Sequence, residues 1–242
     1  MNATAVRKNI SAEIIAVPAT QNDIGSLINF EELSAHVSVV RRKLEAGQYL
    51  YRAGQPFNAL FLVHAGFLKT SLVAEDGREQ ITGFRMRGDL LGVESIGMKT
   101  HACDVIALDT SGVWELPYPA VLNACSRLPR MQAQLTAALA AEIRNDRTWM
   151  LALGTLSAEQ RVATFLLDLA ARHEALGFSN KHFVLRMSRA DIGSFLALKH
   201  ETVTRALTRL SAQGCISVEW REVRVLDAAR LRNTIGLDAR LH

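Results

Sequence analysis

Residues 188–214, which read SRADIGSFLALKHETVTRALTRLSAQG, decide the fold of the C-terminal part of this protein. Ser188 is suited to an N-cap, and Asp191 places a negative charge in the first turn of a short helix. A second helix is predicted over residues 201–213, with Gly214 as its stop. Residues 197–200 form the short connection between the helices. Two short helices around a tight turn indicate a helix-turn-helix.

The second predicted helix has an apolar face, formed by Val203, Ala206, Leu207 and Leu210. Its polar face repeats at helical spacing and consists of Glu201, Thr204, Arg205 and Thr208. Arginine can donate two hydrogen bonds to guanine, glutamate can accept one from cytosine, and threonine can contact a base or a thymine methyl group. We therefore expect Glu201, Thr204 and Arg205 to read bases in double-stranded DNA.

Flanking residues are expected to contact the DNA phosphates, namely Arg189, Lys199, Thr208 and Arg209. Residues 155–242 contain 13 basic and 9 acidic residues, so the net charge of +4 lies in this part of the chain. An ordinary solvated helix face, with Glu201 and Arg205 as an ion pair, is the alternative interpretation. Residues 215–218 and 223–226 favour the DNA interpretation, because they are expected to form a two-stranded wing.

Residues 40–118 have a different pattern, in which short stretches of strand-forming residues are separated by glycines. Residues 60–63 and 67–73 are two of these stretches, and Asp76-Gly77 is typical of a turn between strands. Many short strands with turns between them predict an antiparallel barrel or sandwich. The preceding residues 1–28 are expected to be a loosely ordered arm, followed by a short helix over residues 29–36. The expected fold class is α+β.

A long helix is predicted over residues 129–154, beginning at Pro129 and ending at Gly154. Its apolar positions recur every three or four residues and form a dimerisation seam, consisting of Leu135, Leu139, Ile143, Asp146, Met150 and Leu153. A helix of this length favours a homodimer, with packing on its own domain as the alternative. Asp146 either approaches its own copy, so that repulsion tunes dimerisation, or lies at the wet edge of the seam.

Ser157 is expected to cap a further helix that reaches about His173, and residues 183–187 alternate like a strand. The predicted organisation is therefore an arm at 1–28, a β-roll sensor domain at 29–128, a dimerisation helix at 129–154 and a winged helix-turn-helix at 155–242.

With these features the chain resembles the cyclic-AMP receptor protein / fumarate-nitrate regulator (CRP/FNR) superfamily, and most of all its fumarate-nitrate regulator branch. The similarity covers roughly residues 30–230, and its most specific stretches are residues 77–84, 88–92, 189–193 and 201–205. The resemblance implies a cyclic-nucleotide-binding-like β-roll, a long dimer helix and a winged helix-turn-helix. It also implies that Glu201, Thr204 and Arg205 read a TTGAT-like half-site. Ala197 stands where the family often has glycine, which predicts a slightly different turn.

The sensing residues of the family's known branches are missing. The iron–sulfur members use four cysteines, whereas this chain has three scattered ones, Cys103, Cys125 and Cys215. The cyclic-AMP members clamp phosphate with an arginine-serine pair, where this chain has His101-Ala102. No cofactor or metal is therefore expected. Haem stays open because histidine ligates iron, although we expect His64 and His101 to be ordinary turn or surface residues.

Other classes of protein have little support. The sequence has no P-loop, no G-x-S-x-G and no H-E-x-x-H, so we do not expect an enzyme. No apolar run approaches the length of a membrane span, and the N-terminus lacks the features of a signal peptide. We expect a cytoplasmic transcription regulator, mainly an activator, that binds a TTGAT-N4-ATCAA-like palindrome as a homodimer and contacts RNA polymerase. The alternative is a cyclic-nucleotide-type signalling module acting through the dimer helix rather than through specific DNA readout.

Overall fold

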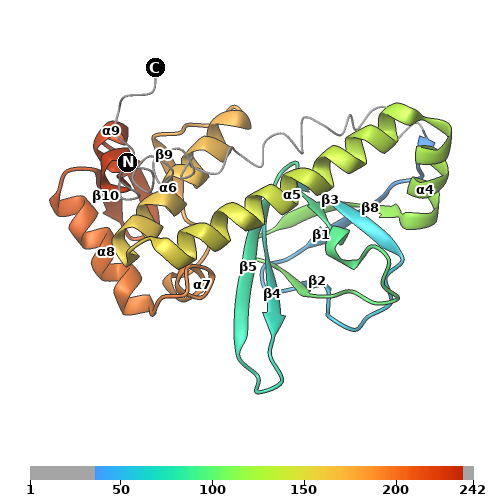
Figure 1. Cartoon of the computed structure of the whole chain (residues 1–242), viewed down its shortest axis with the longest axis horizontal. Helices are drawn as coiled ribbons and strands as arrows, with labels where there is room; N and C mark the ends of the chain where they lie inside the picture. The colour runs from blue at the N-terminus through green and yellow to red at the C-terminus, as the bar shows by residue number, and fades with distance from the viewer. Residues whose placement is uncertain (1–35, 237–242) are drawn as a thin grey trace, which may run out of the picture. The chain divides into compact units, whose positions relative to one another are not determined.

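The computed structural model of this chain describes residues 36–236. The arm predicted at residues 1–28 and nearly all of the short helix predicted at 29–36 lie outside the described residues. The described residues divide into two compact units, and the division falls between Ile143 and Arg144. Figure 1 labels the elements of both units, which are described separately below.

The N-terminal unit contains two antiparallel four-stranded sheets. The first sheet has the order β1-β8-β3-β6, formed by Val40–Leu44, Ser111–Pro117, Ala59–Ala65 and Leu90–Leu91. The second has the order β2-β7-β4-β5, formed by Tyr49–Tyr51, Asp104–Ala107, Phe67–Val73 and Glu79–Met86. A short 3-10 helix η1 (Val93–Ser95) and helix α4 (Tyr118–Arg127) complete the element order. The predicted antiparallel β-roll is confirmed.

The sequence pattern explains these sheets. Strand β3 begins with five consecutive buried residues, as expected of a strand that is covered on both faces. The Asp76-Gly77 turn forms as predicted between β4 and β5, whose long hairpin is visible in Figure 1. There the Gly77 amide donates to the Ala74 carbonyl at 2.9 Å, and Gly77 adopts a φ of +81°. This positive φ suits glycine, which lacks a Cβ atom.

Helix α5 spans Pro129–Thr155. Its predicted beginning at Pro129 is confirmed, but its predicted end is not, because the helix continues through Gly154. Glycine ends a helix when it adopts a left-handed conformation, and Gly154 is not among the residues with positive φ. The Thr155 hydroxyl instead donates to the Leu151 carbonyl at 2.8 Å, within the last turn.

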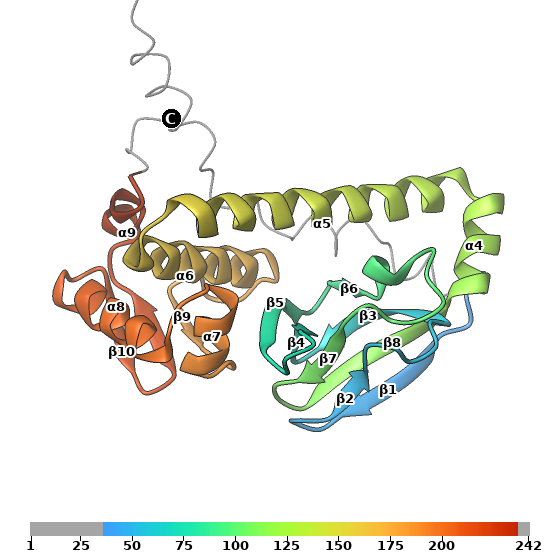
Figure 2. The same cartoon turned by 60° about the horizontal axis from the view of Figure 1, so that its bottom comes forward.

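Among its described residues, the C-terminal unit contains the end of α5, four further helices and a small sheet. Helix α6 (Ala158–Ala175) begins with the predicted capping box, in which Ser157 and Gln160 satisfy each other's backbone amides. It packs against α8 (His200–Ala212) and α9 (Ala228–Thr234), as Figure 2 shows. Helix α7 (Arg189–Phe195) precedes α8, and its Phe195 ring meets Trp149 edge to face.

Candidate nucleic-acid interface

Helices α7 and α8 form the predicted helix-turn-helix. The Ser188 hydroxyl accepts from the Asp191 amide at 3.0 Å, and the Asp191 carboxylate accepts from the Ser188 amide at 2.9 Å. This reciprocal cap satisfies two of the amides that a helix N-terminus leaves without partners. Helix α8 begins at His200, one residue earlier than predicted, and ends at Ala212.

Two small residues fix the angle between these helices. A Cβ atom at Gly193 would lie 2.6 Å from the Leu198 carbonyl oxygen, so a larger side chain would force the turn away from α7. Ala197 adopts a φ of +52°, the left-handed conformation that glycine adopts most readily. The turn between the two helices is therefore left-handed at Ala197.

The apolar face of α8 is buried as predicted, with Val203 and Leu210 both 0% exposed. The predicted base-reading residues Glu201, Thr204 and Arg205 are all exposed on the other face. The Arg205 guanidinium donates to the Thr202 hydroxyl at 3.3 Å, while the Glu201 carboxylate lies 3.4 Å from the His200 ring. The alternative of a Glu201–Arg205 ion pair is thus not what this geometry shows. An exposed guanidinium with a single hydroxyl contact can turn towards an external acceptor.

The predicted phosphate-contacting residues have different surroundings. Lys199 occupies the N-cap position of α8, and both Lys199 and Thr208 are exposed. The Arg209 guanidinium is 71% exposed and lies 3.9 Å from the Glu159 carboxylate. Arg189 is half-buried, and its guanidinium donates to the Trp220 carbonyl at 3.0 Å. Burial, together with the nearby Arg221, lowers the pKa of Arg189 below its ordinary value.

A three-stranded antiparallel sheet flanks the helices, with the order β10-β11-β9. Strands β10 (Ile216–Glu219) and β11 (Glu222–Val225) form the predicted wing. The strand predicted at residues 183–187 is shorter than expected, because β9 covers only His182–Val184. One further backbone bond follows the strand, from the Leu185 amide to the Arg221 carbonyl at 2.8 Å.

Two family models match the chain. A Crp-like helix-turn-helix domain matches residues 160–234, and a cyclic nucleotide-binding domain matches residues 41–127. The transcriptional activator protein anr of Pseudomonas aeruginosa is 39% identical over 206 residues, which are 84% of each chain. The chain belongs to the CRP/FNR family of transcription regulators. Membership places the protein among DNA-binding regulators that act through a helix-turn-helix rather than among enzymes.

Other similar proteins carry the same family signal. The anaerobic regulatory protein of Pasteurella multocida is 36% identical, covering 86% of this chain and 77% of that protein. Among solved structures, FixK2 from Bradyrhizobium japonicum has a TM-score of 0.76 and 30% identity, covering 85% of this chain and all of that one. A CRP-family regulator from Thermus thermophilus has a TM-score of 0.65 at 21% identity, which supports the fold alone.

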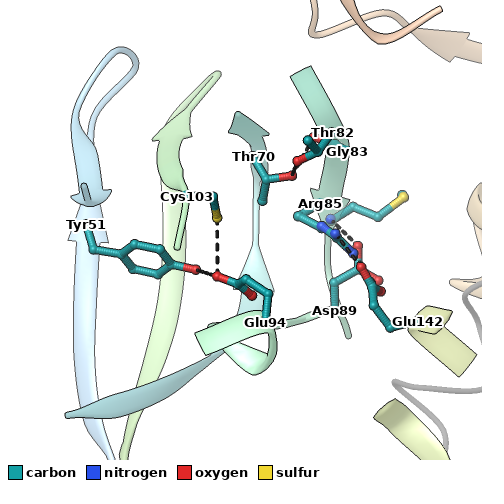
Figure 3. A network of polar contacts seen from close by, with 10 residues as sticks. Tyr51, Thr70, Thr82, Gly83, Arg85, Asp89, Glu94, Cys103 and Glu142 are labelled. Carbon is teal, nitrogen blue, oxygen red and sulfur yellow. Dashed lines mark hydrogen bonds and ion pairs between the residues drawn. The ribbon is translucent and has the colours of Figure 1, made fainter. Parts of the chain in front are cut away.

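The β-roll of this CRP/FNR protein contains a polar cluster that sequence reasoning did not find (Figure 3). One oxygen of the Glu94 carboxylate accepts from the Tyr51 hydroxyl and from the Cys103 thiol, each at 3.2 Å. Burial, reinforced by the Glu94 charge, raises the pKa values of both Tyr51 and Cys103 above their ordinary values. Both groups are therefore protonated donors at neutral pH.

His101 lies beside this cluster, and the expectation that it is a turn or surface residue is wrong. It is 5% exposed, and its ring stacks on Tyr51 with the centroids 3.7 Å apart. Burial lowers the pKa of His101, against the opposing effect of Glu94, so the neutral ring is favoured. His64 is exposed, as expected, and stacks on Trp114 at 4.3 Å.

The same β-roll contains a buried ion pair between strand β5 and helix α5 (Figure 3). Both terminal nitrogens of Arg85 donate to the Glu142 carboxylate, one of them at 2.8 Å. The two side chains are 10% and 14% exposed. Burial alone would lower the pKa of Arg85, but the Glu142 carboxylate, with Asp89 and Glu94, raises it above the ordinary value. The Arg85 guanidinium is thus positively charged and is paired with the Glu142 carboxylate.

These residues do not fit the cyclic phosphate that the nucleotide-binding family model implies. A phosphate needs cationic or neutral donors, and the Tyr51 and Cys103 donors are already engaged by the Glu94 carboxylate. Arg85 is held by Glu142, and His101-Ala102 supplies no guanidinium. Within residues 36–236, no group of three or more histidine, cysteine or acidic side chains is arranged to hold a metal ion.

The three cysteines are all buried and lie in different places. Cys103 faces Glu94, Cys125 lies in the core formed with α4, and Cys215 is 0% exposed at the junction of α8 and β10. None of the helices among the described residues combines the length and apolar character that crossing a membrane requires.

Proposed function

We propose that this protein is a homodimeric activator of transcription that binds a TTGAT-N4-ATCAA-like palindrome. The observation that carries the proposal is the exposed N-terminal half of α8, where Glu201, Thr204 and Arg205 face away from a fully buried apolar side. This is the half of a recognition helix that enters the major groove. The relatives described by name as activators support activation as the main effect.

A gel-shift experiment tests the proposed site. We expect the protein to bind a duplex carrying TTGAT-N4-ATCAA much more tightly than a scrambled duplex of the same composition, at a fixed salt concentration. Equal binding to both, abolished by moderate salt, would contradict specific readout. That result would favour a signalling role in which the β-roll acts through the dimer helix.

The proposed dimer interface lies on α5. Ile143 and Met150 are 51% and 73% exposed, unusual values for large apolar side chains at helical spacing. Leu139 and Leu153 are half-buried, and Asp146 is exposed on the same seam. Leu135 differs, because it packs partly against the core of its own β-roll. A second copy of α5 is the occupant that places two helix-turn-helix motifs on one palindrome.

Replacing Asp146 with alanine is expected to strengthen this dimer. Two copies of an exposed acid facing each other across a symmetric seam repel, and relief is worth on the order of 1 kcal/mol, or about fivefold in the dissociation constant. Sedimentation equilibrium measures the constant. Glu75→Ala, an exposed acid on the β4–β5 turn, serves as the control and should leave it unchanged. A dissociation constant that is unchanged or raised by Asp146→Ala would contradict the prediction and show that Asp146 does not face its copy.

We also propose that RNA polymerase is contacted by the β4–β5 turn, around residues 75–79, which is exposed. The Arg78 guanidinium there donates to the Asp76 carboxylate at 2.6 Å, which orders the tip of the hairpin. The proposed location is the cytoplasm, where the three buried thiols stay reduced. We propose no bound cofactor, in keeping with the unsuitable donors around Glu94.

A further inference from the structure

The tip of the wing carries a side chain that the fold does not need there. Strands β10 and β11 pair from Ile216↔Val225 to Glu219↔Glu222, so Trp220 and Arg221 alone make the turn. Two-residue hairpin turns favour glycine or asparagine, because the backbone must adopt a positive φ. Trp220 has a φ of +54°, and its side chain is 83% exposed. The largest side chain thus occupies a position with an unfavourable backbone and almost no burial.

The tip is held rigidly against the helix-turn-helix. The Trp220 carbonyl accepts from the Arg189 guanidinium at 3.0 Å, and the Arg221 carbonyl accepts from the Leu185 amide at 2.8 Å. Arg189 is the first residue of α7, directly after the Ser188 cap. The exposed indole therefore projects from a surface that is continuous with the predicted DNA interface.

The groups around the indole indicate the chemistry of its partner. The Arg221 guanidinium lies 5.2 Å from the Trp220 ring centre, and Arg189 adds a second cation at the turn. Two acids flank the turn: the Glu222 carboxylate faces the His182 ring at 3.3 Å, and Glu219 precedes Trp220 and is exposed. An indole N–H donates and cannot accept a hydrogen bond, so with two guanidiniums it suits an anionic acceptor beside an apolar surface. The sugar–phosphate backbone of DNA offers both.

We infer that Trp220 is an additional DNA-contacting residue, whose ring packs on the deoxyribose–phosphate backbone beside the bases that α8 reads. The inference rests on the proposed DNA-binding function and extends it to the wing. A backbone contact carries affinity without sequence information. Trp220 should therefore strengthen binding to every duplex by the same factor, while the choice between sequences stays with α8.

The test measures dissociation constants for the palindromic duplex and for a scrambled one. Trp220→Gly suits the positive φ of the turn, so the wing should fold at least as well. We expect this variant to bind both duplexes about tenfold more weakly, with an unchanged ratio between them. Phe178→Ala, which removes another exposed aromatic ring, is the matched control and should bind like the parent protein. Binding of Trp220→Gly within twofold of the parent would overturn the inference.

A second measurement uses fluorescence, which reports contact directly. Trp149 is 7% exposed and Trp114 is half-buried, so acrylamide quenching of the free protein reports mainly on Trp220. We expect DNA to protect this component, which is identified by its absence in Trp220→Gly. Trp220 fluorescence that acrylamide still quenches in the DNA complex would overturn the proposed contact. Protection of Trp220 in concentrated protein without DNA would overturn it too. If the parent protein binds both duplexes equally, the proposed specificity fails, and the wing contact is still judged by these readouts.

Discussion

Replacing Glu142 with alanine is expected to lower the free energy of unfolding of the β-roll by about 3–5 kcal/mol. The substitution leaves the guanidinium of Arg85 buried without its hydrogen-bonded partner, and Arg85 is 8% exposed as a residue. Removing one member of a buried pair costs more than the pair contributes, because the remaining charge keeps its desolvation penalty. Urea denaturation, followed by tryptophan fluorescence, to which Trp114 in β8 contributes, measures the loss.

Two controls separate this effect from a general effect of charge. Glu45 pairs with Lys43 on the surface, where the side chains are 56% and 72% exposed, so Glu45→Ala should leave the stability nearly unchanged. The double variant Arg85→Met, Glu142→Leu replaces both charges with apolar groups and should recover most of the loss. A double variant as unstable as Glu142→Ala would show that shape, rather than an unpaired charge, causes the effect.

The helix-turn-helix could be predicted from the sequence because its determinants are local. Ser188 and Asp191 are three residues apart and cap one helix, and the exposed positions 201, 204 and 205 follow from helical spacing alone. Such short-range rules need no knowledge of the tertiary fold. The β-strand runs and the Asp76-Gly77 turn were predictable for the same reason.

The sensor interior could not be predicted in this way. Arg85 and Glu142 are 57 residues apart, and nothing in either local stretch indicates their pairing. His101 carried no apolar signal, yet the fold packs its ring on Tyr51. Gly154 is a residue type that often ends a helix. It does so only in the left-handed conformation, which Gly154 does not adopt here. The first two differences arise from tertiary contacts that local sequence does not indicate.

The two halves of the molecule therefore diverge in chemistry. The outer face of α8 exposes Glu201, Thr204 and Arg205, which we propose to contact DNA, whereas the polar cluster of the β-roll is satisfied by its own side chains. Glu94 accepts hydrogen bonds from the neutral Tyr51 hydroxyl and Cys103 thiol, and Glu142 pairs with the buried guanidinium of Arg85. Glu142 also directly precedes the exposed Ile143 of the proposed dimer seam.

Replacing Arg205 with alanine is expected to abolish most of the specific DNA binding. A bidentate arginine–guanine contact is worth about 1–3 kcal/mol, and a homodimer on a palindrome makes it twice, so the loss should reach about 2–6 kcal/mol. Binding to a scrambled duplex should change little, because Arg205 carries sequence information rather than general affinity. Titrations of both duplexes, at several salt concentrations, measure the two effects separately.

Arg209→Ala provides the matched control, since Arg209 is another exposed arginine on the same helix, one turn further on. If Arg209 contacts a phosphate, Arg209→Ala should weaken binding to both duplexes by the same factor. It should also reduce the dependence of binding on salt by about one counterion per subunit. The Arg205 variant should instead keep the salt dependence and lose the discrimination at one base pair of each half-site. An Arg205→Ala protein that still discriminates as well as its parent would show that the guanidinium does not read a base, and would shift the readout to Glu201 and Thr204.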